Sequence, residues 1–339
     1  MSKRRYIIPV FIPHRGCPHK CSFCNQREIT GGGDNKESVE ATIEKYLNIY
    51  PKSVNKLEVA FYGGSFTGLS RQKQIELLKP AYIRKKRGYI NDIRISTRPD
   101  YIDGEIISLL TEYGVSIIEL GIQSTDKNVL SLNKRGHSRG EIFDAYNLLR
   151  KYPFKIGLQM MVGLLGDSEN TVLTTAREIA YLKPDFVRIY PTIVLKNTLL
   201  GNLYKKGEFT PFSFDKTVDI CKELLSYFIN NNIPVIRLGL QSTEEINYNK
   251  AIVAGPYHPA FREIVESEIY KDIIEKKLIK LPLPNKKRLL ISCHPEEVSK
   301  VIGHKKSNKK YFIDRYNLEN ITIKQNRNLD EYLIELDIL

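Results

Sequence analysis

The stretch LEVAFYGGSFTG, residues 57–68, shows the unit from which most of this chain is built: a short apolar strand that ends in a turn of glycines and polar residues. Short apolar, β-branched runs predict five further strands, near 6–12, 92–96, 116–122, 154–162 and 186–190. After residue 195 the pattern loosens, with a helix expected near 215–230 and a strand near 233–238. Between the strands lie amphipathic helical segments, SVEATIEKYLNIY, QKQIELLKPAYIRKK, GEIISLLTEYG, RGEIFDAYNLLRK and SENTVLTTAREIAYLK. Six strand and helix repeats predict an α/β fold with a parallel sheet and right-handed crossovers, curled into a partial (β/α)6 TIM-like barrel.

Polar and glycine-rich clusters come directly after the predicted strands. YGGSFTG follows the second strand, STRPD the third, GIQST the fourth and YPT the sixth, while a cysteine-rich loop follows the first. In barrel architectures of this kind, ligands bind at the C-terminal ends of the strands. We therefore expect the functional site at this rim of the sheet.

Three of the five cysteines, Cys17, Cys21 and Cys24, fall within eight positions in the spacing C-x3-C-x2-C. In a chain of this size such crowding indicates a metal or redox site in a reducing compartment. A 4Fe-4S cluster normally takes four thiolates, so three would leave one iron open. An open iron can chelate the amino and carboxylate groups of S-adenosylmethionine (SAM), so the spacing predicts a 4Fe-4S cluster that binds SAM and cleaves it reductively. Cys221 and Cys293 stand alone, and we expect them to be ordinary structural residues.

Two other interpretations of the cysteines remain. A structural zinc site would need a fourth ligand, which His14 or His19 could supply, although no second Cys or His pair follows at zinc-finger spacing. The three cysteines could also form an inert apolar cluster.

The motifs extend well beyond the cysteines and resemble a known family. In order, over roughly the first 200 positions, CPHKCSFC, YGGSFTG, ISTRPD, ELGIQS, NKRGH, GLQMMVGL and VRIYPT are similar to the radical SAM domain of the Elongator catalytic subunit family. Oxygen-independent coproporphyrinogen oxidases are more distantly similar. The resemblance implies a radical SAM enzyme; members of the Elongator family modify C5 of wobble uridines in tRNA and also carry an acetyltransferase domain. Because this sequence ends at Leu339, we expect no such domain here.

The resemblance also implies roles for individual residues. The positions that match cofactor contacts of the relatives, to the amino group, adenine, ribose or carboxylate of SAM, are Phe23, Gly63, Gly64, Ser96, Arg98, Gln123, Arg135 and Gln159. Glycines allow close backbone approach, and an arginine fork suits a carboxylate. Tyr190 and Lys196, in IYPTIVLKNT, match the part of the rim that faces the substrate and are the candidate catalytic residues.

Three functions are compatible with these features. The first is a radical SAM enzyme that acts on RNA, and the second is a radical SAM enzyme that acts on a small metabolite or tetrapyrrole. The third is a noncatalytic iron-sulfur protein that binds RNA, which would leave the SAM-facing matches without a purpose.

Positive charge concentrates near the C-terminus. The chain has 52 Lys and Arg against 39 Asp and Glu, a net charge of +13. Between residues 280 and 310, nine Lys or Arg face only Glu296 and Glu297, so 9 − 2 = +7 lies in this segment. Such a patch favours a polyanionic partner, and we expect RNA, specifically tRNA, to bind there.

A proline-containing linker precedes this basic region, so the sequence predicts a radical SAM core with its extension over 1–280 and a small basic α+β domain over 285–339. The domain should run strand, helix, turn, helix, strand, strand. Its turn, Gly303 to Lys306, resembles the GXXG loop with which KH domains clamp nucleic acid, although Lys306 replaces the second glycine.

The N-terminus combines basic and apolar residues but contains Pro9 and Pro13 and lacks a small-residue cleavage site, which argues against a signal peptide. No run approaches the roughly 18 apolar residues of a membrane helix. We therefore expect a cytoplasmic protein with no membrane contact. The expected redox chemistry needs an electron donor such as flavodoxin or ferredoxin.

Overall fold

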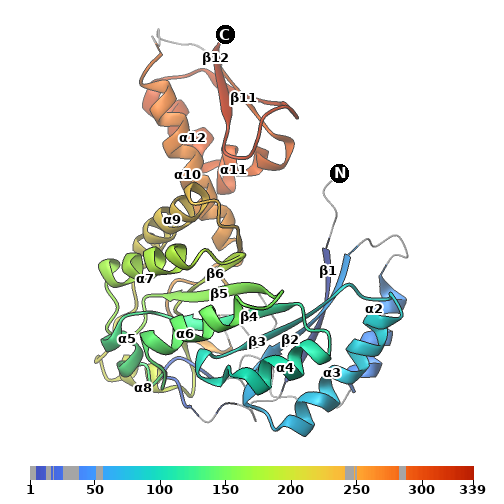
Figure 1. The fold of residues 1–339 in the computed structure, drawn as a ribbon. Coiled ribbons are helices and arrows are strands. Elements are labelled where there is room, and N and C mark those ends of the chain that lie inside the picture. Colours follow the sequence, from blue (N-terminus) through green and yellow to red (C-terminus); the bar gives the residue numbers. More distant parts are fainter. Residues whose placement is uncertain are drawn as a thin grey trace. The chain divides into compact units, whose positions relative to one another are not determined.

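The computed structural model describes residues 5–12, 17, 19–25, 38–50, 56–240, 248, 250–281 and 288–339. The chain forms two compact units (Figure 1). Unit 1 comprises Met1–Ser213 and Phe228–Tyr257, and unit 2 comprises Phe214–Tyr227 and His258–Leu339.

Unit 1 is built on a curled sheet of seven parallel strands in the order β1-β2-β3-β4-β5-β6-β8. The strands are β1 (Arg5–Ile12), β2 (Lys56–Gly63), β3 (Asp92–Thr97), β4 (Ile117–Gln123), β5 (Lys155–Val162), β6 (Phe186–Pro191) and β8 (Val235–Leu238). The six strands predicted from the sequence are therefore confirmed, as is the partial-barrel fold. The seventh strand, β8, adds to the sheet by pairing in parallel with β6.

The crossover helices lie along one face of this sheet, as Figure 1 shows. They are α2 (Val39–Ile49), α3 (Arg71–Lys86), α4 (Gly104–Glu112), α5 (Lys127–Leu132), α6 (Arg139–Leu149) and α7 (Glu169–Leu182). Alternate strand residues such as Ile93, Ile95, Ile118 and Leu158 are fully or almost fully buried beneath them. The other face, which we call the inner face, carries polar and charged side chains.

Two local features shape the carboxyl edge of the sheet. The backbone of Gln123 at the end of β4 has φ of 68°, and the pairing with β5 shifts register between Gly121 and Gln123. Gly63, at the end of β2, has φ of 115°, and a Cβ added there would lie 2.5 Å from the carbonyl oxygen of Ile12. Only glycine fits this close strand approach.

Beyond β6, unit 1 continues into a short antiparallel ribbon of β7 (Val194–Leu195) and β9 (Ile252–Ala254), with α8 (Leu199–Lys205) following β7. These elements contribute the last part of the rim.

Unit 2 contains a three-stranded sheet in which the central strand pairs in parallel with β11 and antiparallel with β12. Its elements are most of α9 (Phe214–Asn230), α10 (Phe261–Leu278), β10 (Arg288–Cys293), α11 (Val298–Ile302), α12 (Ser307–Tyr316), β11 (Asn320–Gln325) and β12 (Ile334–Ile338). The predicted order of strand, helix, turn, helix, strand, strand is confirmed.

The boundary of unit 2 differs from the one expected between residues 280 and 285. Tyr270, Ile274 and Leu278 of α10 are fully buried in the same apolar cluster as Leu289 and Phe312. Helix α10 therefore completes the core of unit 2. The sequence analysis missed this because it placed the domain boundary at the prolines of the linker. Those prolines lie outside the described residues.

No helix of the described part of the chain is long and apolar enough to cross a membrane.

Candidate metal and cofactor site

The cysteine loop follows β1 at the carboxyl edge of the sheet. Cys21 is buried, while Cys17 and Cys24 are half-buried, and all three thiols are free of disulfides. The amide of Cys24 donates to the carbonyl of Cys21 over 3.1 Å, which closes a turn. The loop thus offers three thiols from one short segment.

A single metal ion is a poor fit for this loop. Among the described residues, no three His, Cys, Asp or Glu side chains converge closely enough to hold one ion. The zinc interpretation loses support, although His14, one of its candidate ligands, lies outside the described residues. A cluster of several irons, being larger than one ion, does not need its thiolates to converge in that way.

Residues far away in sequence fix the loop. The side chain of Ser22 donates to Oδ1 of Asn133 over 2.5 Å, and its amide donates to the carbonyl of Asn133 over 3.1 Å. The amide of Leu200, in α8, donates to the carbonyl of Ser22 over 2.8 Å. Phe23 packs against a small apolar cluster that includes Val194 and Leu200. The loop is therefore held at both the α5 and the α8 side.

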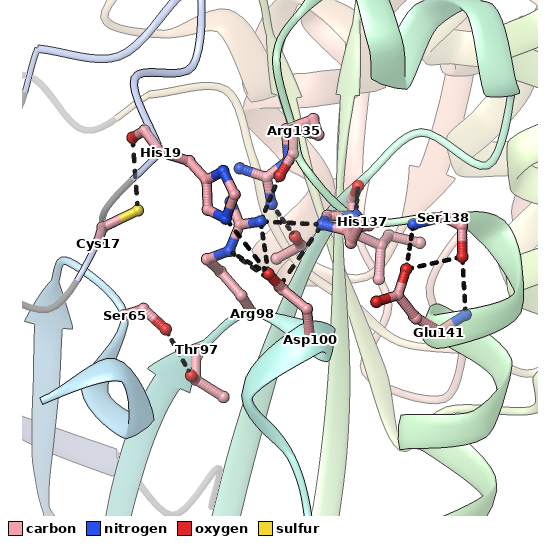
Figure 2. Close-up of polar contacts among 12 residues, drawn as sticks. Cys17, His19, Ser65, Thr97, Arg98, Asp100, Arg135, His137, Ser138 and Glu141 are labelled. Atoms are coloured by element: carbon pink, nitrogen blue, oxygen red, sulfur yellow. Dashed lines mark hydrogen bonds and ion pairs between the residues drawn. The ribbon is translucent and has the colours of Figure 1, made fainter.

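Two buried arginines, Arg98 and Arg135, lie beside Cys21. Figure 2 shows both of them with Asp100 and His137. Arg135 donates from Nη1 to Sγ of Cys21 over 3.2 Å and from Nη2 to the carbonyl of Gly121 over 2.5 Å. Its Nε is buried and has no hydrogen-bond partner among the residues that the structure describes. Arg98 donates to both carboxylate oxygens of Asp100 over 2.9 Å and also to the carbonyl of Arg135. The Nη1 of Arg98 lies 4.0 Å from Sγ of Cys21.

Burial alone would lower the pKa of Arg98. The hydrogen bond to Asp100 and the negative charges of Asp100, Cys21 and Cys17 outweigh burial and raise that pKa. The guanidinium of Arg98 is therefore charged in the folded protein.

His137 is neutral in this arrangement. Burial, followed by the positive charges of Arg135 and Arg98, lowers the pKa of its imidazole to about 3. The ring accepts from Arg98 at Nδ1 (3.5 Å) and donates from Nε2 to the carbonyl of Ile122 (3.3 Å). Since Arg98 can only donate, this pattern fixes the Nε2–H tautomer.

Within the described residues, Asp100 is the carboxylate that contacts Arg98, and no carboxylate contacts Arg135. Apart from the cysteines themselves, two guanidinium charges face one carboxylate, so the protein side carries a surplus of +1 next to Cys21. A buried, unmatched charge is costly unless an anion joins it. The surplus charge and the unpartnered Nε of Arg135 thus fit an anionic group held by the three thiolates.

His19 and Gly136 bring the cysteine loop against the segment that carries Arg135. Gly136 has φ of 70°, and a Cβ added there would overlap the His19 ring. Nε2 of His19 also lies 3.6 Å from Asp100. Glycine is therefore required at position 136 of the NKRGH motif for two reasons: the positive φ and the close packing against His19.

The glycine turn after β2 is tied to the end of β3 through hydroxyl groups. Oγ of Ser65 lies 2.8 Å from Oγ1 of Thr97, and Oγ1 of Thr67 lies 2.5 Å from the same atom (Figure 2 shows the first of these contacts). Gly63 and Gly64 therefore stand on a fixed turn next to the arginine pair.

The inner face of the sheet contains a second arginine cluster, which the sequence analysis did not single out. Arg94 of β3 forms ion pairs with Glu58 of β2 and Glu119 of β4. Nη2 of Arg188, in β6, lies 2.8 Å from Glu119. Each residue is a lone charge inside an apolar strand, and that recurring pattern is the signal by which the sequence could have revealed the cluster.

The inner face also receives several of the expected contact residues. Ser96 donates to Glu119 over 3.2 Å, and Gln159 donates to Gln123 over 3.3 Å. Arg188 donates to the hydroxyl oxygen of Tyr190 over 3.1 Å. An arginine only donates, so the hydroxyl hydrogen of Tyr190 stays available to another group.

Lys196 lies apart from this cluster. Its side chain is exposed, and its backbone carbonyl accepts from Asn25, one residue past Cys24, over 3.4 Å. The structure therefore brings Lys196 to the cysteine loop and Tyr190 to the inner face.

Comparison with known proteins agrees with this geometry. The model of the Radical SAM superfamily matches residues 11–179, and the model of the Radical_SAM C-terminal domain matches residues 184–271. The chain belongs to the radical SAM superfamily. It is thus a radical SAM enzyme, and members of the superfamily generally use a 4Fe-4S cluster and SAM.

Individual relatives are similar over the same region. A tRNA uridine(34) acetyltransferase of Methanocaldococcus infernus is 35% identical over 63% of this chain and 48% of its own length. An uncharacterized protein of Methanocaldococcus jannaschii is 29% identical over 65% of this chain and 71% of its own length. The match thus spans about half the length of the acetyltransferase.

Among solved structures, the archaeal Methanocaldococcus infernus Elp3 with an N-terminal deletion resembles this enzyme with a TM-score of 0.61 and 23% identity, covering 80% of this chain and 63% of that one. This likeness concerns the fold.

Proposed function

We propose that Cys17, Cys21 and Cys24 hold a 4Fe-4S cluster whose open iron binds SAM, and that the enzyme modifies a uridine of tRNA. The observation that carries the proposal is the contact between Cys21 and the buried, charge-unmatched Arg135. An anionic cluster would supply the negative charge that this part of the rim lacks.

The residues proposed to contact SAM surround the same rim. Gly63 and Gly64 present backbone to its amino group, since a side chain at Gly63 would strike β1. The other proposed contacts are Phe23, Ser96, Gln123 and Gln159. Arg98 and Arg135 are further proposed SAM contacts, although protein acceptors already engage Nε and Nη2 of Arg98 and Nη2 of Arg135.

When bound, the cluster supplies the electron for the reductive cleavage of SAM. On the protein side, Arg188 holds the phenol of Tyr190 so that its hydroxyl hydrogen can donate to the substrate. We assign Lys196, exposed beside the cysteine loop, to substrate contact as well.

The names of the relatives and the charge of unit 2 support tRNA as substrate. The most exposed lysines of the basic segment include Lys305 and Lys306, which both adopt left-handed backbone with φ of 53° and 64°. Lys300, in contrast, pairs with Glu266 and Glu297 inside the unit. We therefore place RNA contact at the turn 303–306 rather than along the whole segment.

We further propose a cytoplasmic enzyme that receives electrons from flavodoxin or ferredoxin. Cysteines that bind an iron-sulfur cluster must not be oxidised to disulfides. Cys17, Cys21 and Cys24 form no disulfide, which supports a reducing compartment.

The cluster can be tested by changing each of Cys17, Cys21 and Cys24 to Ala under anaerobic reconstitution. We expect loss of bound iron and of 5′-deoxyadenosine formation from SAM with dithionite, because each thiolate is a ligand. Cys221→Ala and Cys293→Ala serve as matched controls and should keep both. A triple variant that still held about four irons and cleaved SAM would refute the proposal.

The substrate can be tested through Lys305 and Lys306. Changing both to Ala should weaken tRNA binding and flatten the slope of log affinity against log salt by about 1 to 2 units, while SAM cleavage without substrate stays unchanged. A double Gly variant is the matched control, because it loses the same charges but accepts positive φ. Equal losses in both variants would attribute the effect to charge. Absence of tRNA binding by the unaltered enzyme would favour a small metabolite or tetrapyrrole.

A further inference from the structure

Arg135 occupies an unusual position for a group expected to bind SAM. Two of its guanidinium nitrogens already donate, Nη1 to Sγ of Cys21 and Nη2 to the carbonyl of Gly121. Only 5% of the residue is exposed. Its donors point into the protein and toward a cluster ligand, and the fork is not open to receive a carboxylate.

The neighbours of Arg135 hold it in that orientation. Its own carbonyl accepts from Arg98, which Asp100 grips with both carboxylate oxygens. Neutral His137 accepts from Arg98 and is itself anchored to Ile122. Figure 2 shows the contacts of Arg98 with Arg135, Asp100 and His137, and the contact of Asp100 with His19 of the cysteine loop.

Charge reinforces the geometry. Asp100 balances one guanidinium, His137 contributes no charge, and the remaining positive charge lies 3.2 Å from a cluster ligand. Hydrogen bonds to the sulfurs and nearby positive charge stabilise the more negative, reduced form of an iron-sulfur cluster.

We infer that Arg135 is a positioning residue for the cluster: its hydrogen bond to Cys21 raises the reduction potential of the 4Fe-4S centre, with Arg98, Asp100 and His137 holding it in place. This inference rests on the proposed cluster. Reduction adds one electron from the external donor to the cluster, and no bond to Arg135 forms or breaks.

The test compares anaerobically reconstituted Arg135→Gln and Arg135→Lys with the unaltered enzyme, using EPR-monitored redox titration without SAM. Arg135→Gln should be harder to reduce, by at least a tenfold change in the reduction equilibrium constant, or about 59 mV for a one-electron couple. Arg135→Lys keeps the charge and should lie between. The matched control is Arg139→Gln, an exposed arginine four positions away that pairs with Glu178.

Each outcome is decisive. If the unaltered enzyme takes up no cluster, the proposed function fails. If it does, and Arg135→Gln carries full iron at an unchanged potential, the inference alone is overturned. Loss of SAM binding with unchanged potential would assign Arg135 to SAM instead. If Arg135→Gln takes up no iron, the potential of Arg135→Lys decides, and a value equal to that of Arg139→Gln overturns the inference.

Discussion

Unit 1 contains two clusters of buried arginines that differ in their charge balance. On the inner face, Arg94 and Arg188 meet Glu58 and Glu119, two positive against two negative charges. At the rim, Asp100 pairs with Arg98, while Arg135 has no contacting carboxylate among the described residues. The charges of the inner cluster are balanced within the protein, whereas the rim carries a surplus positive charge that an anionic group would offset. The difference separates a structural ion network from the proposed cofactor site.

The largest expected effect comes from unbalancing the inner face. Glu119→Gln leaves Arg188 and part of Arg94 without a carboxylate, and should lower the free energy of unfolding by about 3 to 5 kcal/mol. Far-UV circular dichroism in urea measures this, since the chain contains no tryptophan.

Glu178→Gln is the control, because its pair with the exposed Arg139 should contribute no more than about 1 kcal/mol. A loss below about 1 kcal/mol for Glu119→Gln would show that the inner cluster is not structural in this sense.

Two glycine substitutions, one on the inner face and one at the rim, should separate an effect on folding stability from an effect on iron uptake. In Gly157→Ala, the new methyl would overlap the ring of Phe186, which packs under Arg94, and should cost about 1 to 3 kcal/mol of stability. In Gly136→Ala, the methyl would displace the partly exposed His19, at a backbone cost of about 1 to 2 kcal/mol.

Iron uptake should therefore fall in Gly136→Ala and stay normal in Gly157→Ala. Urea unfolding and iron content after reconstitution measure the two effects. Equal iron uptake in both variants would show that the position of His19 does not affect iron binding by the cysteine loop.

The smallest effect is a pH dependence confined to the rim. The folded-state pKa of His137, about 3, lies below the ordinary histidine value of 6.5, so the unfolded chain binds a proton first as pH falls. Stability from this group is present above pH 6.5 and is lost toward pH 3, with a slope of up to about 1.4 kcal/mol per pH unit.

His137→Asn can still accept from Arg98 but does not titrate. Between pH 7 and pH 5, the free energy of unfolding of His137→Asn should fall less with decreasing pH than that of the unaltered protein. The difference between the two slopes should be at most about 1.4 kcal/mol per pH unit, measured by urea unfolding of the cluster-free form. Parallel pH profiles would indicate that His137 is not buried neutral.

Local sequence patterns determined the cofactor class and the sheet. The spacing of Cys17, Cys21 and Cys24 depends only on ligand type and loop length, and short apolar runs set each of the six predicted strands. These features are predictable because neighbouring residues alone specify them. The strand near 233–238 was also expected, but its place beside β6 in the sheet and the role of α10 were not, since both depend on what packs against them.

The charge of the rim was decided by the tertiary structure. Arg135 meets Cys21 across 114 positions of sequence, and His137 is neutral only because folding buries it beside two arginines. Composition shows how many charges a chain has but not which of them share a buried space. The sequence therefore determined that the rim would hold three thiols, while the fold decided that a surplus positive charge would stand beside one of them, because long-range packing sets burial and pairing.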